Sequence, residues 1–239
     1  MTDTANRNVD AAQSLLRRIA RDHAPAACAS SLGAEDMVLT DLIFRNDLPI
    51  EVFTLDTGRL PEDTYSLLDA IAGHYGQRLR VVFPRLESVE AYVNVHGVNG
   101  FYGSVELRKG CCHIRKVEPL RRALSGKRAW ITGLRRDQSE TRSGIAVESF
   151  DADNGLMKFS PLAEWSHQDV WEYLREHGVP YNALYDRGYS SIGCAPCTRA
   201  VAAGEESRAG RWWWENPESK ECGLHVSPDG KTVRAREPA

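Results

Sequence analysis

The sequence lacks long hydrophobic runs, a secretory leader and a strong excess of charge. It contains no run of eighteen apolar residues, the length that a membrane-spanning helix needs. Residues 1–10 are polar, without the apolar core of a secretory signal. The formal net charge of −3 provides no general attraction for nucleic acid, although Arg135 and Arg136 could still serve an anionic ligand. We therefore expect a cytoplasmic protein that binds neither membranes nor nucleic acid.

Internal repeats and low-complexity segments are also absent. With 42% hydrophobic residues, a chain of 239 residues can bury one substantial core, and its length allows one large domain or two small ones. Six cysteines without a secretory signal argue against a disulfide framework and favour metal binding or thiol chemistry. We predict one nucleotide- and metal-binding α/β domain over residues 1–215, followed by a functional tail over residues 216–239.

Strand and helix signals alternate along the first half of the chain. Apolar strands are predicted at residues 26–31, 50–55, 79–83 and 129–134, with helices beginning at Ala34 and near Pro61. Strands separated by helices indicate a mostly parallel sheet. Asp153-Asn154-Gly155 predicts a hairpin between residues 147–150 and 157–160. A helix capped by Ser166 should run to residue 176 or 177, just before Gly178.

Four of the six cysteines form two tight pairs, Cys111-Cys112 and Cys194-Ala-Pro-Cys197. Thiolates at this spacing suit zinc or an iron-sulfur cluster, and the alternative is that one or both pairs are buried core thiols. Adjacent cysteines reach a single tetrahedral zinc with difficulty, whereas a 4Fe-4S cube offers each sulfur a different iron. This favours the cluster. Lys116 follows Cys112 by four residues, so a helix would place it on the same face, unless it is an ordinary solvated lysine.

The other two cysteines differ from the pairs in their surroundings. Cys28 lies inside the first apolar strand and is interpreted as a core residue. Cys222 lies near the end of the chain, where Lys220 and His225 could favour its thiolate. A thiolate on a flexible segment could attack a bound substrate and then meet a second protein. The alternative is an ordinary surface thiol.

Two loops follow predicted strands and could bind a ligand at the carboxyl edge of the sheet. Residues 30–36, Ser-Ser-Leu-Gly-Ala-Glu-Asp, lead from a strand into a helix, whose backbone N–H groups can hold a phosphate. The loop lacks the Gly-Lys-Ser/Thr ending of a Walker A motif, and alone it could be a mere tight turn. Residues 55–58, Leu-Asp-Thr-Gly, end the next strand at the same edge.

Arginines also gather in two places along the chain. Residues 133–142 contain three of them, a number suited to a phosphate or sulfate ligand, and Arg208 and Arg211 precede three consecutive tryptophans. Any one arginine is more often solvated surface. The tryptophans at residues 212–214 cannot all face one core, so at least one could cover the site or a partner.

These motifs together resemble the assimilatory adenylyl-sulfate reductases, relatives of the phosphoadenylyl-sulfate reductases with an adenine nucleotide alpha-hydrolase-like (PP-loop type) fold. The resemblance covers about residues 28–225. It comprises the loops at residues 30–36 and 55–58, both cysteine pairs with Arg115-Lys116, residues 133–142, and Glu-Cys-Gly-Leu-His at 221–225. Within this family the paired cysteines mark the cluster-containing branch that uses adenosine 5'-phosphosulfate.

The resemblance implies a role for each of these residues. Cys222 would be the nucleophile and the four paired cysteines would hold a 4Fe-4S cluster. The substrate would be bound by Ser30, Gly33, Asp56, Thr57, Gly133, Lys116, Arg142, Arg208 and Arg211, and the last four of these, all cations, would face the phosphosulfate. Ser31 and Leu32 depart from the usual family loop, so Leu32 receives no polar role.

The implied reaction is thioredoxin-dependent. The Cys222 thiolate would attack the sulfonyl sulfur, AMP would leave, and thioredoxin would release sulfite from the S-sulfocysteine. Plant members carry a fused redox domain after the catalytic cysteine, whereas this sequence ends seventeen residues after Cys222, so we expect a separate thioredoxin. The alternatives are a phosphoadenylyl-sulfate or dual-specificity reductase, an ATP pyrophosphatase or sulfurtransferase of the same fold, and a zinc-stabilised nucleotide-binding module. The sequence is also compatible with a homo-oligomer.

Overall fold

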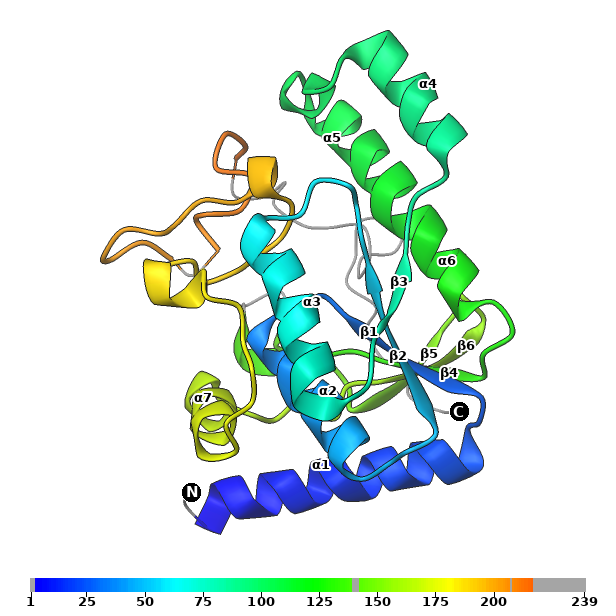
Figure 1. Cartoon of the computed structure of the whole chain (residues 1–239), viewed down its shortest axis with the longest axis vertical. Coiled ribbons are helices and arrows are strands. Elements are labelled where there is room, and N and C mark those ends of the chain that lie inside the picture. The colour runs from blue at the N-terminus through cyan, green and yellow to red at the C-terminus, as the bar shows by residue number, and fades with distance from the viewer. Residues whose placement is uncertain (1–2, 139–141, 207, 217–239) are drawn as a thin grey trace.

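The computed structural model describes residues 3–138, 142–206 and 208–216 of the chain. Its centre is a six-stranded sheet with the spatial order β3-β2-β1-β4-β6-β5 (Figure 1). The strands are β1 (Ala26–Ser30), β2 (Ile50–Leu55), β3 (Arg80–Val82), β4 (Ala129–Ile131), β5 (Glu148–Asp151) and β6 (Leu156–Phe159). All pairs are parallel except β5 with β6, a hairpin that the sequence predicted. The mostly parallel α/β class is therefore confirmed.

The strand order reverses its direction between β1 and β4, which are neighbours in the sheet. From β1 the chain adds β2 and β3 on one side, and β4 begins the other side. Helices leave two adjacent strands in opposite directions at such a point, so a crevice opens beyond their carboxyl ends. The predicted loops after β1 and β2 both lie at this edge.

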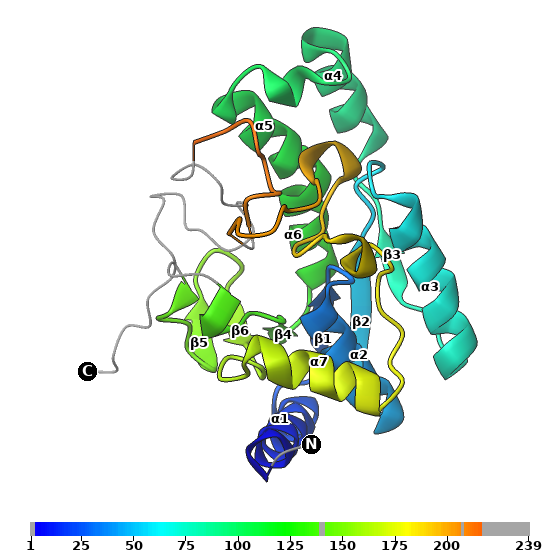
Figure 2. The same ribbon diagram turned by 90° about the vertical axis from the view of Figure 1, so that its left-hand side faces the viewer.

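Helices cover both faces of the sheet and create two cores. One face carries α1 (Asp3–Asp22), α2 (Ala34–Arg45), α3 (Glu62–Tyr75) and α7 (His167–Glu176). The opposite face carries α6 (Glu118–Leu124) (Figures 1 and 2). Cys28 belongs to the first core and its neighbour Ala27 to the second, because successive strand residues point to opposite faces. The interpretation of Cys28 as a core residue is confirmed.

A continuous helical rod joins α5 (Val105–Cys112) to α6 through a π-helix, His113–Val117. The helix predicted after the first cysteine pair is confirmed, but its middle turn is wider than an α-helix, with the Glu118 N–H donating to the His113 carbonyl. Pro119 explains this difference. It has no N–H to donate and its ring would clash with the carbonyl four residues earlier, so the backbone widens there.

Three helices were not predicted from the sequence, and one strand ends earlier than predicted. The sequence did not predict α1, although Leu16 and Ile19 of this helix are fully buried. Two further helices, α4 (Leu86–His96) and α5, also form where none was predicted. The fourth strand ends at Ile131 and not at Leu134, because the next residues turn into the site. Within the described residues, no helix has the length and apolar character needed to cross a membrane.

Candidate active site

A cavity of about 440 Å³ lies beyond the carboxyl ends of β1, β2 and β4. Most of the predicted ligand residues line it, namely Ser30, Gly33, Thr57, Lys116, Gly133, Arg142, Arg208 and Arg211. The fold thus brings together residues from five separate parts of the sequence. Asp56 is the one predicted substrate residue that does not appear among the described residues of the cavity wall.

The loop after β1 uses its polar side chains to hold its own backbone. The Ser30 hydroxyl accepts the Leu32 N–H at 3.2 Å, and the Ser31 hydroxyl donates to Asp36 at 2.6 Å. Leu32 adopts a left-handed backbone with φ of 62°, unusual for a residue with a side chain, and buries that side chain in the core. Leu32 therefore anchors the loop by packing, while Gly33 immediately precedes α2 at the cavity wall.

Asp36 joins this loop to the end of β4. Its carboxylate accepts the backbone N–H of Ser31 at 2.6 Å and also that of Gly133. Gly133 must be glycine here, because a Cβ atom would lie 2.4 Å from the Asp36 Oδ1. Burial raises the pKa of Asp36 to about 6, against the opposing effect of these hydrogen bonds. The two loops at the reversal point are thus held in direct contact.

The loop after β2 is ordered by Asp56 and Thr57. The Asp56 carboxylate accepts the Gly58 N–H at 2.7 Å and the Tyr65 hydroxyl at 3.0 Å. Burial, and then this carboxylate, raise the pKa of Tyr65 to about 12, so its hydroxyl stays protonated as a donor. The Thr57 carbonyl accepts from the Arg115 guanidinium at 2.6 Å. Asp56 therefore shapes the loop, and its part in binding substrate stays a prediction.

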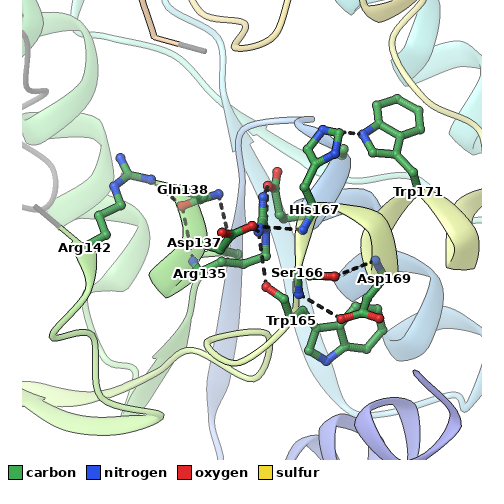
Figure 3. A network of polar contacts seen from close by, with 12 residues as sticks. Arg135, Asp137, Gln138, Arg142, Trp165, Ser166, His167, Asp169 and Trp171 are labelled. Carbon is green, nitrogen blue, oxygen red and sulfur yellow. Dashed lines mark hydrogen bonds and ion pairs between the residues drawn. The ribbon is translucent and has the colours of Figure 1, made fainter. Parts of the chain in front are cut away.

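The three arginines of residues 133–142 have three different surroundings, and Figure 3 shows those of Arg135 and Arg142. Arg135 is buried and pairs with Glu35 at 2.9 Å and Asp137 at 3.2 Å. Arg136 points outward and pairs with Glu164. Arg142 lines the cavity and donates to the Gln138 side chain. Arg135 thus neutralises carboxylates within the fold, which leaves Arg142 as the member of this group best suited to an anionic ligand.

Gln138 links Arg142 to the end of β4. Its Oε1 also accepts the Arg135 N–H at 3.2 Å, and its amide donates to the Gly133 carbonyl at 3.4 Å (Figure 3). One side chain therefore contacts both the predicted anion ligand Arg142 and the predicted nucleotide loop. Sequence reasoning did not single out Gln138, because its partners become neighbours only when residues 133–142 fold back on themselves.

Aromatic residues that the sequence analysis did not select complete another part of the wall. His167, Trp171 and Tyr185 line the cavity, and the Trp171 indole donates to the His167 Nε2 at 3.0 Å. The His167 N–H donates to Asp137, which connects α7 to the Arg135 pair (Figure 3). The Tyr185 hydroxyl accepts the Ala34 N–H at the start of α2. The sequence signal for His167 and Trp171 was the predicted helix cap at Ser166, which the structure confirms as a capping box at the start of α7.

The two cysteine pairs meet beside the cavity. Cys111 and Cys112 end α5, whereas Cys194 precedes the turn Ala195–Cys197 and Cys197 ends it. Burial, followed by the Cys194 thiol, raises the pKa of Cys197 to about 12, and Cys111 adds to this effect. Burial also raises the pKa of Cys111, which Arg115 opposes. Lys116 and Arg211 favour the Cys197 thiolate, so Lys116, which was expected beside the cysteines, and Arg211, which was not, both lie near this thiol.

The donor set of the two pairs fits a sulfur-ligated metal centre. The described residues contain no group of three or more cysteine, histidine or acidic side chains arranged to hold a metal ion. The chemistry of the site is nevertheless suitable: neighbouring thiols oppose each other's ionisation, which bound iron would relieve. The Thr57 hydroxyl lies 3.2 Å from the Cys194 sulfur, and cations lie near Cys111 and Cys197. Cys111, Cys112, Cys194 and Cys197 would be its ligands.

The three tryptophans point in different directions, as predicted. Trp212 is buried, Trp213 is 39% exposed, and the Trp214 ring packs on Tyr102 with centroids 4.4 Å apart. The predicted nucleophile Cys222 and the predicted tail, residues 216–239, lie outside the described residues except for Asn216.

Known proteins resemble this chain in sequence and fold. Residues 25–200 match the family model described as phosphoadenosine phosphosulfate reductase domain. A protein of Allochromatium vinosum named adenosine 5'-phosphosulfate reductase is 54% identical over 224 residues, covering 94% of this chain and 88% of that protein. One of Burkholderia cepacia with the same name is 51% identical over 219 residues, covering 92% and 88%.

Solved structures give the same fold. The phosphoadenylyl-sulfate reductase of Candida auris, in a phosphate complex, superimposes with a TM-score of 0.69 at 27% identity, covering 84% of this chain and 98% of that one. The NH3-dependent NAD synthetase of Campylobacter jejuni has a TM-score of 0.53 at 9% identity, with 80% of each chain covered, and supports the fold alone. These likenesses confirm the predicted adenine nucleotide alpha-hydrolase-like fold.

Proposed function

Because the chain belongs to the phosphoadenosine phosphosulfate reductase family, we propose that it is an enzyme that reduces adenosine 5'-phosphosulfate to sulfite and AMP. The supporting observation is the cavity itself. Lys116, Arg142, Arg208 and Arg211 line it together with the loops after β1 and β4. A nucleotide with two adjacent anionic groups matches a cavity that combines strand-end backbone with these four cations and with Arg135, whose charge is balanced by Glu35.

The chemistry is a transfer of the sulfonyl group to a thiolate. The Cys222 thiolate attacks the sulfonyl sulfur, the bond from sulfur to the phosphate oxygen breaks, and AMP leaves with that electron pair. Attack by an anion on an anion needs cations, and Lys116 with the three arginines stabilises the charge that develops on the leaving oxygen. The product on the protein is an S-sulfocysteine.

Thioredoxin is the proposed reductant. One of its thiolates attacks the sulfur of Cys222, sulfite leaves, and a mixed disulfide forms. The second thioredoxin thiol attacks that disulfide, which restores the Cys222 thiol and leaves oxidised thioredoxin. The two electrons thus come from two thiols. We propose a cytoplasmic location on this basis, in keeping with the free state of the five described cysteines.

We further propose that the four paired cysteines hold a 4Fe-4S cluster. When bound, the cluster supplies a structural tie and an electrostatic field beside the phosphosulfate. The protein's own residues do the remaining work there. Arg115 holds the loop after β2 through the Thr57 carbonyl, and Lys116 lies close enough to Cys197 to favour its thiolate.

Sulfite release with thioredoxin tests the proposal most directly. Purified protein is given adenosine 5'-phosphosulfate, the 3'-phosphorylated compound, or ATP. We expect sulfite from the first compound, none without thioredoxin, and no consumption of ATP. Cys222→Ser should abolish release, whereas Cys28→Ala, which changes a core thiol, should retain it. Release by the Cys222 variant at the normal rate would remove the proposed nucleophile, and a preference for the 3'-phosphorylated compound would change the substrate.

A further inference from the structure

One ion pair lies almost entirely inside the protein. The Arg108 guanidinium on α5 donates two hydrogen bonds to the Glu215 carboxylate, each 2.8 Å long, and the two side chains are 1% and 3% exposed. The partners are 107 positions apart in the sequence. A buried pair of this kind often stabilises a fold no more than apolar side chains of similar size would. Its two-point geometry, in contrast, defines one position for both partners.

Arg108 also begins a stack of side chains that leads to the cavity. Its guanidinium lies 4.6 Å from the centre of the Trp212 ring, and Arg211 lies 4.5 Å from the same ring. Trp212 adopts φ of 41°, a left-handed backbone that a bulky residue rarely takes and that its surroundings must maintain. Trp212 therefore connects the buried pair to Arg211, a residue of the cavity wall.

The position of Arg211 depends closely on this stack. A Cβ atom on Gly193 would lie 2.5 Å from the Arg211 Nη2, so the guanidinium is pressed against bare backbone on its other side. Its hydrogen bonds to Ser191 and Ile192 are long, at 3.5 Å each. Packing by Trp212 and Gly193 thus contributes more to its orientation than these contacts do.

The same residues touch both cysteine pairs. Arg108 forms a hydrogen bond with the Cys112 side chain, and the Trp212 N–H donates to the Cys197 carbonyl at 3.3 Å. Figures 1 and 2 show the orange segment that contains Arg211 and Glu215 beside α5. The junction therefore joins α5, the second cysteine pair and the arginine segment at one buried point.

We propose that the Arg108–Glu215 pair is a positioning device for the reaction: through Trp212 it orients the Arg211 guanidinium toward the anionic end of the substrate. The inference builds on the proposed function and adds two residues to it. A bidentate pair holds Trp212 in its strained backbone, and the ring fixes Arg211 from behind. Without the pair, Arg211 gains freedom and must be ordered by each substrate molecule, which weakens binding.

The test compares variants that separate folding from positioning. Arg108→Met or Glu215→Met leaves one buried charge without its partner, so each single variant should unfold at a lower temperature. The double variant should recover most of that loss, because neither charge remains. Affinity for ADP, whose β-phosphate has the shape of the sulfonyl group, should stay roughly tenfold weaker in the double variant. The KM for adenosine 5'-phosphosulfate should rise by a similar factor.

Two controls make the result decisive. Arg18→Met with Glu148→Met removes an exposed long-range pair, 2.6 Å apart, and should leave ADP affinity unchanged. In an Arg211→Met background, Arg108→Met should weaken ADP binding no further, because the pair acts through Arg211. Normal ADP affinity in the double variant, or fully additive losses with Arg211→Met, would overturn the proposal. If the unaltered protein binds ADP but releases no sulfite, the proposed reaction fails and ADP affinity alone decides the positioning role.

Discussion

The Thr57 hydroxyl oxygen lies 3.2 Å from the Cys194 sulfur and also accepts the Arg59 N–H at 3.2 Å. Since that oxygen already accepts one hydrogen bond, its own proton is available for the sulfur. The loop that follows β2 at the nucleotide-binding edge therefore forms a hydrogen bond with a proposed cluster ligand. The two functional regions share this residue.

We expect Thr57→Val to weaken the metal centre while keeping the side-chain shape. Loss of the hydroxyl removes the hydrogen bond to Cys194 and leaves the Arg59 N–H without its acceptor, a cost of about 1–3 kcal/mol. Iron content and visible absorbance should fall faster in air than in the unaltered protein. Thr57→Ser keeps the hydroxyl and should behave normally. Equal rates of bleaching in all three proteins would show that the hydrogen bond does not protect the centre.

The raised pKa of Asp36 leads us to expect a measurable dependence of stability on pH. Burial raises its pKa to about 6 from an ordinary value of 3.8, so the folded protein holds the proton more tightly than the unfolded chain. Its stabilising contribution is therefore complete below about pH 4 and is lost as pH rises through 6. Asp36→Asn cannot titrate. Between pH 5 and pH 7, the unaltered protein should lose about 1 kcal/mol in free energy of unfolding relative to this variant.

Urea titrations at several pH values measure this difference. The hydrogen bonds that Asn makes or loses change the free energy of unfolding of the variant by the same amount at every pH. The informative quantity is therefore how the difference in free energy of unfolding between the two proteins varies with pH. A pH-independent difference would mean that Asp36 titrates normally in the fold.

Gly133→Ala should disturb the contact between the two loops at the reversal of strand order. The new methyl group would lie 2.4 Å from Asp36 Oδ1 and 3.2 Å from its backbone nitrogen, so α2 must move. We expect a loss of about 1–3 kcal/mol in stability and weaker nucleotide binding. Gly144→Ala is the matched control, because nothing described lies within 4 Å of a Cβ there. Thermal unfolding and ADP titration of both variants test the expectation.

Local sequence patterns predicted the strands of the sheet well, but they did not predict every helix or the side-chain contacts between distant parts of the chain. Val52 and Phe53 lie in an apolar run, so β2 was predicted with its observed ends, and the parallel order followed from the helices between strands. In α1, by contrast, Leu16 and Ile19 are separated by charged residues, so the helix is recognised by its buried face and not by a run.

The residues of the candidate site likewise fall into those that the sequence predicted and those that only the structure reveals. Predicted ligand residues such as Ser30 and Lys116 were found because a strand end or a neighbouring cysteine marks them. Gln138 and Arg108 carry no such mark. Their importance comes from partners that only the folded chain provides, Arg142 for one and Glu215 for the other. Sequence patterns report local periodicity and motif spacing, whereas these contacts depend on tertiary packing.

Gln138→Met offers a test of how Arg142 is oriented. Methionine has a similar volume but cannot accept from Arg142 or donate to the Gly133 carbonyl, so the arginine loses a support on the cavity wall. We expect the KM for adenosine 5'-phosphosulfate to rise by roughly tenfold, with a smaller change in kcat if Arg142 serves binding more than the chemical step. Gln168→Met is the matched control: the exposed Gln168 side chain donates to Glu172 on the same helix, α7, so its loss should leave both constants unchanged.

The effect of Gln138 should disappear once Arg142 is gone. In an Arg142→Met background the substitution of Gln138 removes no further contact with the substrate's anionic end, so the two losses should not add. Steady-state sulfite release from the four proteins of this cycle measures the coupling. Independent, additive losses would instead assign Gln138 to the Gly133 loop, because its amide would then act through the Gly133 carbonyl and not through Arg142. Either outcome separates the two partners that the same side chain holds, which a single substitution cannot do.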